Sequence, residues 1–398
     1  MDATITFFPV DNGDMTLIIL ESGRTILIDT NIRADADDPD NSTRDVANDL
    51  RERLRRDDQN RLYVDVFLLS HPDKDHCSGL DKHFHLGKPE EHTKDKILIR
   101  EIWSSPLIFR RASKNHTLCS NAKKFNQEAK RRVSRYKQSH LATDGDRILI
   151  LGHDENGKTD KLSEILVDIG EVIEKVNGQE DAGVSALLLA PLPSSEDESE
   201  LNVHSKNDSS VIIQFTINAS GGSCRFLTCG DAEVAIWERL WELHLGSVGC
   251  LEYDLLHSPH HCSWHSLSYD SWGEKGEDAE VNVNARRALS QALKGANIVA
   301  SSKPITDIDA DPPCTRAKRE YEDILKPVSG KFLCTGEYPS KEHPVPLEYE
   351  IGSYGLALKP VALPKIGMAA IASMSSGGNL IQPKMGMAAF ASKSSGGN

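Results

Sequence analysis

Short apolar runs alternate with amphipathic stretches along most of this chain. The runs in the first seventy residues predict four strands, at 5–10, 15–20, 24–29 and 62–70. Before the last of these strands, Val46, Leu50 and Leu54 recur at every fourth position, which predicts an amphipathic helix. We expect Ser42 or Thr43 to cap this helix, because a hydroxyl at that position accepts a hydrogen bond from the first turn.

The same alternation returns in the second half of the chain. Its apolar runs predict five further strands, at 184–190, 210–216, 224–229, 253–258 and 297–302. Helical patterns are present at 160–176, 232–244 and 284–294. Strands that alternate with helices in this way predict sheets covered by helices.

Composition limits the class of protein. With 398 residues and a formal net charge of −14, the chain can form one large or two ordinary domains, and it is not coated in positive charge for duplex binding. No segment approaches 18 consecutive apolar residues, and the N-terminus resembles no secretory signal, so we expect a soluble, cytoplasmic protein with no membrane partner. The eight cysteines contain no CxxC pair, which favours reduced thiols over a disulfide framework.

One segment departs from the acidic average. Residues 88–140 carry 14 Lys or Arg against 5 Asp or Glu. This segment is either a solvated helix face or a basic rim that gathers a polyanionic substrate. We expect residues 88–180 to form a basic, largely helical insertion in the main domain.

The C-terminal tail contains a duplicated peptide. Residues 364–379 recur as 383–398 with 13 of 16 positions identical, and both copies are rich in Gly, Ser and Ala. Such a composition buries little surface, so we expect 351–398 to be a flexible tail. The repeats are either a docking or modification sequence for a protein partner or a neutral extension.

The strongest chemical signal is the sequence SHPDKDHCSG at 70–79, directly after an apolar strand. It places His71, Asp73, Asp75 and His76 in one loop, and imidazole and carboxylate ligands suit Zn, Mn or Fe. Because residues two apart project to the same side of an extended backbone, His71 and Asp73 can share one metal and leave the other two for a second. The alternative is a polar loop that caps the following helix.

Two distant segments supply what such a site would otherwise lack. In FLTCGDAE at 226–233, Asp231 follows a strand and a glycine; alone it would be interpreted as a helix N-cap. In the segment 254–266 a strand ends in clustered histidines. His260 and His261 are the candidate ligands there, His257 is expected to be packed, and the role of His265 stays open.

These motifs, together with DNGD at 11–14 and ILIDTN at 26–31, resemble the metallo-beta-lactamase fold, most closely the stand-alone relatives of the hydrolase domain in the DNA-uptake protein ComEC. The resemblance covers about residues 3–305. It implies an α+β four-layer αββα sandwich over 1–350, with a metal site at one edge between the two sheets. Asp14 and Asp29 are expected to organise turns beside that site, and they can also act on it from behind its ligands.

The family pattern HxHxDH maps onto the loop at 70–79, so Asp73 stands where a second histidine is usual. Asp231 corresponds to the carboxylate that bridges two metals, and the last histidine falls at His260 or His261, with a slight preference for His260. Cys262 replaces the usual glycine. A further family histidine has no clear match in 202–215, so oxygen ligands would shift the preference from Zn towards Mn. We expect one or two divalent ions and no nucleotide cofactor.

The resemblance implies a metal-dependent hydrolase. The leading hypothesis is a phosphodiesterase or nuclease that acts on DNA or another nucleotide-containing substrate through metal-activated water, with Asp75 and His76 as catalytic residues. One alternative is hydrolysis of an ester, thioester or amide, since one fold supports many chemistries. Another is a non-catalytic binding protein with a degraded metal site and a functional repeat tail.

Overall fold

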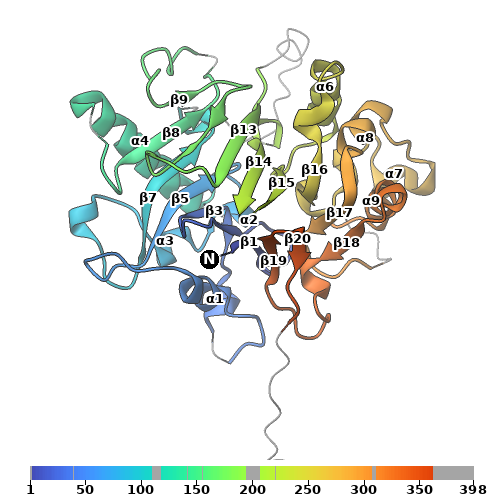
Figure 1. Ribbon diagram of the computed structural model, residues 1–398, viewed down its shortest axis with the longest axis horizontal. Coiled ribbons are helices and arrows are strands. Elements are labelled where there is room, and N and C mark those ends of the chain that lie inside the picture. Colours follow the sequence, from blue (N-terminus) through green and yellow to red (C-terminus); the bar gives the residue numbers. More distant parts are fainter. Residues whose placement is uncertain are drawn as a thin grey trace, which may run out of the picture. The chain divides into compact units, whose positions relative to one another are not determined.

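The computed structural model contains two β-sheets that lie between layers of helices (Figure 1). It describes residues 2–38, 40–109, 118–140, 142–154, 156–193, 207–219, 221–306 and 311–361. Met1–Lys359 forms one compact unit. None of the helices in this described part combines the length and the apolar character needed to cross a membrane.

The first sheet carries the N-terminal half of the chain. Its strands follow the order β20-β19-β1-β2-β3-β5-β7-β8-β9, with β6 paired to β7. Their bounds are β1 Ala3–Phe7, β2 Thr16–Ile19, β3 Thr25–Ile28, β5 Tyr63–Leu69, β6 Phe84–His85, β7 Ile97–Ser104, β8 Arg147–Leu151, β9 Leu166–Val167, β19 Leu347–Gly352 and β20 Gly355–Leu358. From β3 through β5, β7 and β8 the strands run parallel, so their carboxyl ends lie at one edge.

The second sheet is built from the C-terminal half, in the order β10-β13-β14-β15-β16-β17-β18. Its strands are β10 Val172–Ile173, β13 Val184–Ala190, β14 Ile212–Ala219, β15 Gly222–Thr228, β16 Tyr253–His257, β17 Ala292–Ala300 and β18 Lys331–Cys334. The last four of these run parallel. Two short pieces lie outside both sheets: β4 Thr30–Asn31, and the pair β11 Lys175–Val176 with β12 Gln179–Glu180.

The helices differ in which sheet they cover. The α-helices are α1 Val46–Arg53, α2 Lys74–Cys77, α3 Leu80–His83, α4 Ser120–Ser139, α6 Val234–Leu243, α7 Trp272–Lys275, α8 Val283–Leu289 and α9 Thr315–Leu325. Buried side chains of α1 and α4 pack on the outer face of the first sheet. Those of α6, α8 and α9 pack on the outer face of the second.

A third apolar cluster fills the space between the two sheets. Successive side chains along a strand therefore point in turn to this central cluster and to a cluster under the helices. In β5, Val66 and Leu68 belong to this central cluster, whereas Phe67 belongs to the cluster under α1 and α4. In β15, Phe226 faces the centre and Leu227 faces the helices. Each sheet therefore buries both faces, and the chain is a mixed α/β sandwich of two sheets and two helical layers.

Most predicted strands are present, but three local predictions are wrong. Helix α1 is capped by Asp45, whose carboxylate accepts a hydrogen bond from the Asn48 backbone (2.9 Å), and not by Ser42 or Thr43. The predicted helix at 160–176 is replaced by turns and by the short strands β9 and β10, since its apolar residues are adjacent and β-branched. The helix predicted at 284–294 ends at Leu289, because β17 begins three residues later.

The segment 88–180 is not a largely helical insertion. Its helix α4 is flanked by β7 and β8, which are central members of the first sheet. The fold also continues beyond residue 350, because β20 pairs with β19. The repeats at 364–379 and 383–398 lie outside the described residues.

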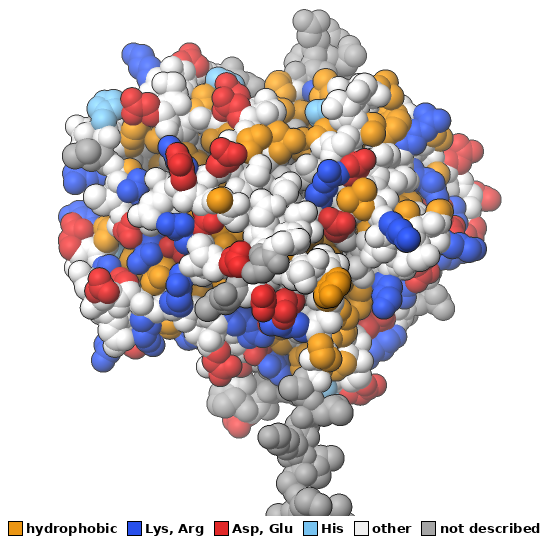
Figure 2. Space-filling model, in the orientation of Figure 1, with side chains coloured by type: hydrophobic (Ala, Val, Ile, Leu, Met, Phe, Trp, Pro, Cys, Tyr) orange, Lys and Arg blue, Asp and Glu red, His pale blue; other side chains and the backbone are white. Residues whose placement is uncertain are grey.

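Two arginines of the basic segment form ion pairs inside the fold. Arg132 is 1 % exposed, pairs with Glu128 (2.7 Å) and donates to the carbonyl of Ile99 (2.9 Å). Arg131 pairs with Glu128 and with Asp146. These arginines connect α4 to the neighbouring strands and loop. On the face shown in Figure 2, basic and acidic side chains are interspersed. Arg131 and Arg132 therefore have structural roles and are not part of a free basic rim.

The contact between the sheets gives a first prediction. Phe226 is fully buried and packs edge-on against Phe7 of the opposite sheet, with ring centroids 5.7 Å apart. We expect Phe226→Ala to lower the free energy of unfolding by about 3–5 kcal/mol, because it leaves a cavity between the sheets. Urea denaturation measures this change. Tyr354→Ala, at a fully exposed tyrosine, is the control and should change it by less than about 0.5 kcal/mol; equal effects would contradict the packing argument.

Candidate metal centre

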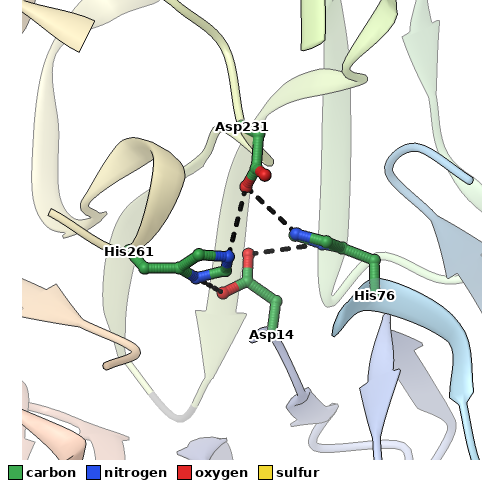
Figure 3. Close-up of side chains that lie close together, drawn as sticks. All are labelled: Asp14, His76, Asp231 and His261. Carbon is green, nitrogen blue, oxygen red and sulfur yellow. Dashed lines mark ion pairs between the residues drawn. The ribbon is translucent and has the colours of Figure 1, made fainter. Parts of the chain in front are cut away.

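Four chain segments converge beyond the strand ends at one edge of the two sheets. Asp14 precedes β2, His76 lies in α2 after β5, Asp231 follows β15, and His261 follows β16. All four side chains are buried, and each offers one ligand atom within 4.8 Å of the others (Figure 3). This buried group of two carboxylates and two imidazoles can hold a metal ion.

Asp231 lies at the centre of a wider arrangement. Its Oδ1 is 3.0 Å from Nε2 of His76 and 3.5 Å from Nε2 of His261. Its Oδ2 is 3.3 Å from Nε2 of His71 and 3.6 Å from Nε2 of His260. Each carboxylate oxygen therefore faces one pair of imidazoles, and the Asp231 carboxylate lies between the two pairs.

The contacts in this group fit metal ligation better than hydrogen bonding. Within the described part of the chain, Nε2 of His71, His76 and His261 and Oδ1 of Asp231 have no hydrogen-bond partner, although all are buried. Buried polar atoms normally have a hydrogen-bond partner, so the unpaired state of these atoms is what ligands of a metal ion would show. Ligand atoms about 2 Å from a tetrahedral zinc lie about 3.3 Å from one another, close to the separations around Asp231.

Asp75 is a further carboxylate beside the group of Asp14, His76, Asp231 and His261. Its Oδ2 lies 3.3 Å from Nε2 of His261. The Asp75 side chain is 38 % exposed, whereas those of Asp231 and His261 are almost fully buried. Asp75 is therefore where the cluster meets solvent.

The opposite nitrogens of the histidines face other carboxylates. Nδ1 of His76 lies 2.8 Å from Oδ2 of Asp29, and Nδ1 of His261 lies 3.2 Å from Oδ1 of Asp14. A histidine that donates through Nδ1 presents its Nε2 lone pair to a metal. Asp29 and Asp14 thus orient the rings so that both Nε2 atoms point at Asp231.

Ser70 links this outer network to the second imidazole pair. Its hydroxyl donates to Oδ2 of Asp29 (2.5 Å) and lies 3.1 Å from Nδ1 of His71. The backbone N–H of Ser70 donates to the other oxygen of Asp29. One buried carboxylate therefore holds the rings of His71 and His76 through contacts on their Nδ1 sides.

The backbone around the cluster is unusual. His260, His261 and Cys262 are three consecutive residues with left-handed φ angles of 50°, 53° and 69°. Each such residue costs on the order of 1 kcal/mol or more, and clusters of them mark functional sites. Gly230 also has a positive φ, and a Cβ there would lie only 3.0 Å from the Ser70 hydroxyl, so a side chain at this position would push Ser70 away.

Electrostatic coupling within the cluster is strong. Burial would raise the pKa of Asp231, but the charges of the surrounding histidines hold it well below its usual range. Burial opposes charge on His261, yet Asp231 and Asp14 raise its pKa to about 10. The same balance raises the pKa of His76. The pKa of Asp75 falls to about 2, because contact with His261 and the charge of His76 outweigh burial.

The structure brings together most of the predicted ligands. Besides His76 and Asp231, the side chains around the cluster are those of His71, Asp75, His260 and His261. His261 belongs to the compact group of four shown in Figure 3. His260 is less buried and, of the two Asp231 oxygens, contacts Oδ2, so the slight preference for His260 over His261 is not supported. Asp73 is not in that group; it occupies the N-cap of α2, near Cys77 and Cys119.

Asp14 does more than organise a turn. Its carboxylate contacts His257 and His261, both at 3.2 Å, which agrees with the expected influence from behind the ligands. Its pKa is lowered because the charges of these histidines outweigh burial. His257 is packed as expected, against the ring of Phe7. The DNGD sequence alone contains no signal for these contacts, because the histidines lie far along the chain.

Comparison with known proteins gives no further guide. No protein-family model matches the chain, and no curated protein matches its sequence. The interpretation of this centre therefore depends on its geometry.

Metal binding should be linked to pH. The raised pKa values of His76 and His261 mean that both rings are protonated near neutral pH without metal, and a cation must displace these protons. We expect log affinity for Zn²⁺ to rise by about 2 per pH unit between pH 6.5 and 8. Calorimetry in buffers of different ionisation enthalpy measures the released protons. An affinity independent of pH would contradict this ligand set.

The role of Asp29 gives a separate prediction. Asp29→Asn keeps the shape of the side chain but removes the charge that orients His76, so metal affinity should fall about 10- to 100-fold. Equilibrium dialysis with Zn²⁺ and Mn²⁺ measures this. Asp65→Asn is the matched control, because Asp65 is an equally buried carboxylate that pairs with Arg100 and Thr25. Equal losses in both variants would show a merely structural effect.

Proposed function

We propose that this chain is a metal-dependent hydrolase with a metallo-beta-lactamase-like fold, and that it cleaves phosphodiesters of nucleic acid or of another nucleotide-containing substrate. The observation that carries the proposal is the position of Asp231, whose two oxygens each face a pair of imidazoles. A carboxylate placed in this way suits a bridge between two cations. The mixed α/β sandwich and the order of the motifs along the chain support the same fold.

The donor set fits Zn²⁺ or Mn²⁺. Imidazole nitrogens suit zinc, whereas carboxylate oxygens also suit manganese. His76, His261, Asp231 and Asp75 would hold one ion; Asp14 is not counted with them, because its oxygens face the Nδ1 sides of both histidines. His71 and His260 would hold a second ion with the other oxygen of Asp231. The second group has fewer protein ligands, so we expect it to bind its ion more weakly. Divalent ions in such a centre make water more acidic and stabilise negative charge on a phosphoryl oxygen.

His76 and Asp75 have different roles in the proposed reaction. His76 is fully buried and both of its ring nitrogens face carboxylates, so we assign it to ligation and not to proton transfer. Asp75 is partly exposed and, with a pKa of about 2, is ionised at neutral pH. It can therefore accept a hydrogen bond from a water molecule and orient it towards the substrate.

A cleft beside the cluster provides room for a substrate. It encloses about 880 Å³, and Asp75 forms part of its wall. Its polar lining combines three basic residues, three acidic residues and three asparagines, which are Arg33, Lys74, Lys82, Asp35, Asp75, Asp81, Asn12, Asn31 and Asn121. Basic and amide groups are suited to phosphate and sugar oxygens.

The cleft also limits how a nucleotide would be recognised. None of its lining residues, all of which lie in the described part of the chain, is aromatic. Base stacking is the usual way in which single-stranded nucleic acid is gripped at its bases. We therefore expect contacts to phosphate and sugar and little preference for base sequence.

An assay with matched variants tests the proposal. The protein, supplied with Mn²⁺ or Zn²⁺, should release nucleotides from DNA or RNA and nitrophenol from bis-nitrophenyl phosphate. Asp231→Asn should lower the rate at least about a hundredfold, because it removes the charge that both imidazole pairs face. Asp323→Asn, at an exposed aspartate of α9, is the control and should keep full activity.

The same screen separates the alternatives. Cleavage of nitrocefin or of an acyl-thioester, without cleavage of any phosphodiester, would favour ester, thioester or amide hydrolysis on this fold. Absence of all activity in a protein that binds stoichiometric metal would favour a binding role. A strong preference for one base at the cleaved position would contradict recognition through phosphate and sugar.

A further inference from the structure

Two thiols lie side by side next to the cluster. Cys77 is the last residue of α2, and Cys119 is the N-cap of α4, yet their Sγ atoms are only 3.4 Å apart. Helix α2 and the beginning of α4 form adjacent parts of the same wall, since Lys74 and Asn121 both line the cleft. Forty-two positions separate the two cysteines in the sequence, so only the fold brings them together.

The two thiols differ in accessibility. Cys119 is partly exposed, and its sulfur accepts a hydrogen bond from the backbone N–H of Ala122 at the beginning of α4 (3.4 Å). Contact with Cys77 and these helix N–H groups lower the pKa of Cys119 to about 6, against the effect of burial. Cys77 is fully buried and donates to the carbonyl of Asp73 (2.9 Å). The pair thus combines an accessible thiolate with a sheltered thiol.

Metal binding does not explain this pair. A structural zinc site needs four ligands. Among the described residues, the compact group of potential ligands, Asp14, His76, Asp231 and His261, contains neither cysteine. The two sulfurs are therefore left to react with each other.

We infer that Cys77 and Cys119 form a reversible disulfide when the protein meets hydrogen peroxide, and that this disulfide loosens the metal centre. In the first step the Cys119 thiolate attacks the peroxide; an S–O bond forms, the O–O bond breaks, and water leaves after one proton is taken up. In the second step the Cys77 sulfur attacks the resulting sulfenic acid; the S–S bond forms, and the hydroxyl leaves with the Cys77 proton as a second water. Two thiols are oxidised and one peroxide is reduced.

The link to the metal centre is the short helix α2. A disulfide brings two sulfurs to about 2.05 Å, so its formation from the present 3.4 Å draws the end of α2 and the beginning of α4 towards each other. The bond from Cys77 to the Asp73 carbonyl is lost, and that carbonyl also accepts from the backbone of His76. Asp75 and His76 lie between these two residues, so their side chains move with the turn. This second effect rests on the proposed metal centre; the disulfide does not.

Peptide mapping tests the disulfide directly. The full-length protein is treated with stoichiometric hydrogen peroxide, alkylated, and digested without reductant for mass spectrometry. We expect one dominant cross-link, Cys77 to Cys119, which dithiothreitol reverses. Cys119→Ser should abolish it, whereas Cys250→Ser, at another partly exposed thiol, should leave it unchanged. Sulfinic acid at Cys119 with Cys77 still reduced, or cross-links scattered among other cysteines, would overturn the inference.

Metal retention tests the consequence. Dialysis of metal-loaded protein against a weak chelator should show at least about tenfold weaker retention after oxidation, and no change for peroxide-treated Cys119→Ser. Unchanged retention in fully cross-linked protein would overturn the link to the metal centre. A protein that forms the cross-link but binds no metal in either redox state would instead overturn the proposed hydrolase and leave the disulfide standing.

Discussion

The geometry of this molecule depends on one buried carboxylate that must be neutralised. Asp231 is almost completely removed from water, and its Oδ1 has no hydrogen-bond partner within the described residues. A carboxylate in such a place is tolerated only if positive charge lies close to it. Four imidazoles surround it at 3.0–3.6 Å. His76 and His261, whose pKa values are raised, can supply that charge as protonated rings, and all four imidazoles can supply it as ligands of a cation.

The two-sheet sandwich brings the imidazoles close to Asp231. The parallel strands β5, β15 and β16 each deliver a loop to the same edge, and the apolar cluster between the sheets fixes how far apart these loops lie. Gly230 allows the β15 loop to approach Ser70, and the left-handed run from His260 turns two adjacent imidazoles towards one aspartate. Strain in the backbone is therefore concentrated where the charges meet, and the core of the two sheets offsets it.

Much of this could be predicted from the sequence, for a physical reason. Strands that bury both faces appear as continuous apolar runs, so β5, β13 and β16 are visible directly, and ligand loops follow β5 and β16. Asp14 could not be assigned in the same way, because nothing local to DNGD distinguishes a turn carboxylate from one that faces two histidines 243 and 247 positions further along the chain. The structural role of Arg132 was hidden for the same reason: its partners include a carbonyl in a neighbouring strand.

Proton and cation occupancy are two ways of balancing the same charge. Without metal, the raised pKa of His261, about 10, leaves a protonated imidazole beside the ionised Asp231. A folded-state pKa raised in this way adds stability that is fully present below the ordinary histidine pKa and is lost as pH rises towards 10. A cation has the opposite preference, since it binds only neutral imidazole. Rising pH therefore weakens the metal-free cluster and strengthens metal binding at the same atoms, while the packing between the sheets holds those atoms in position in both states.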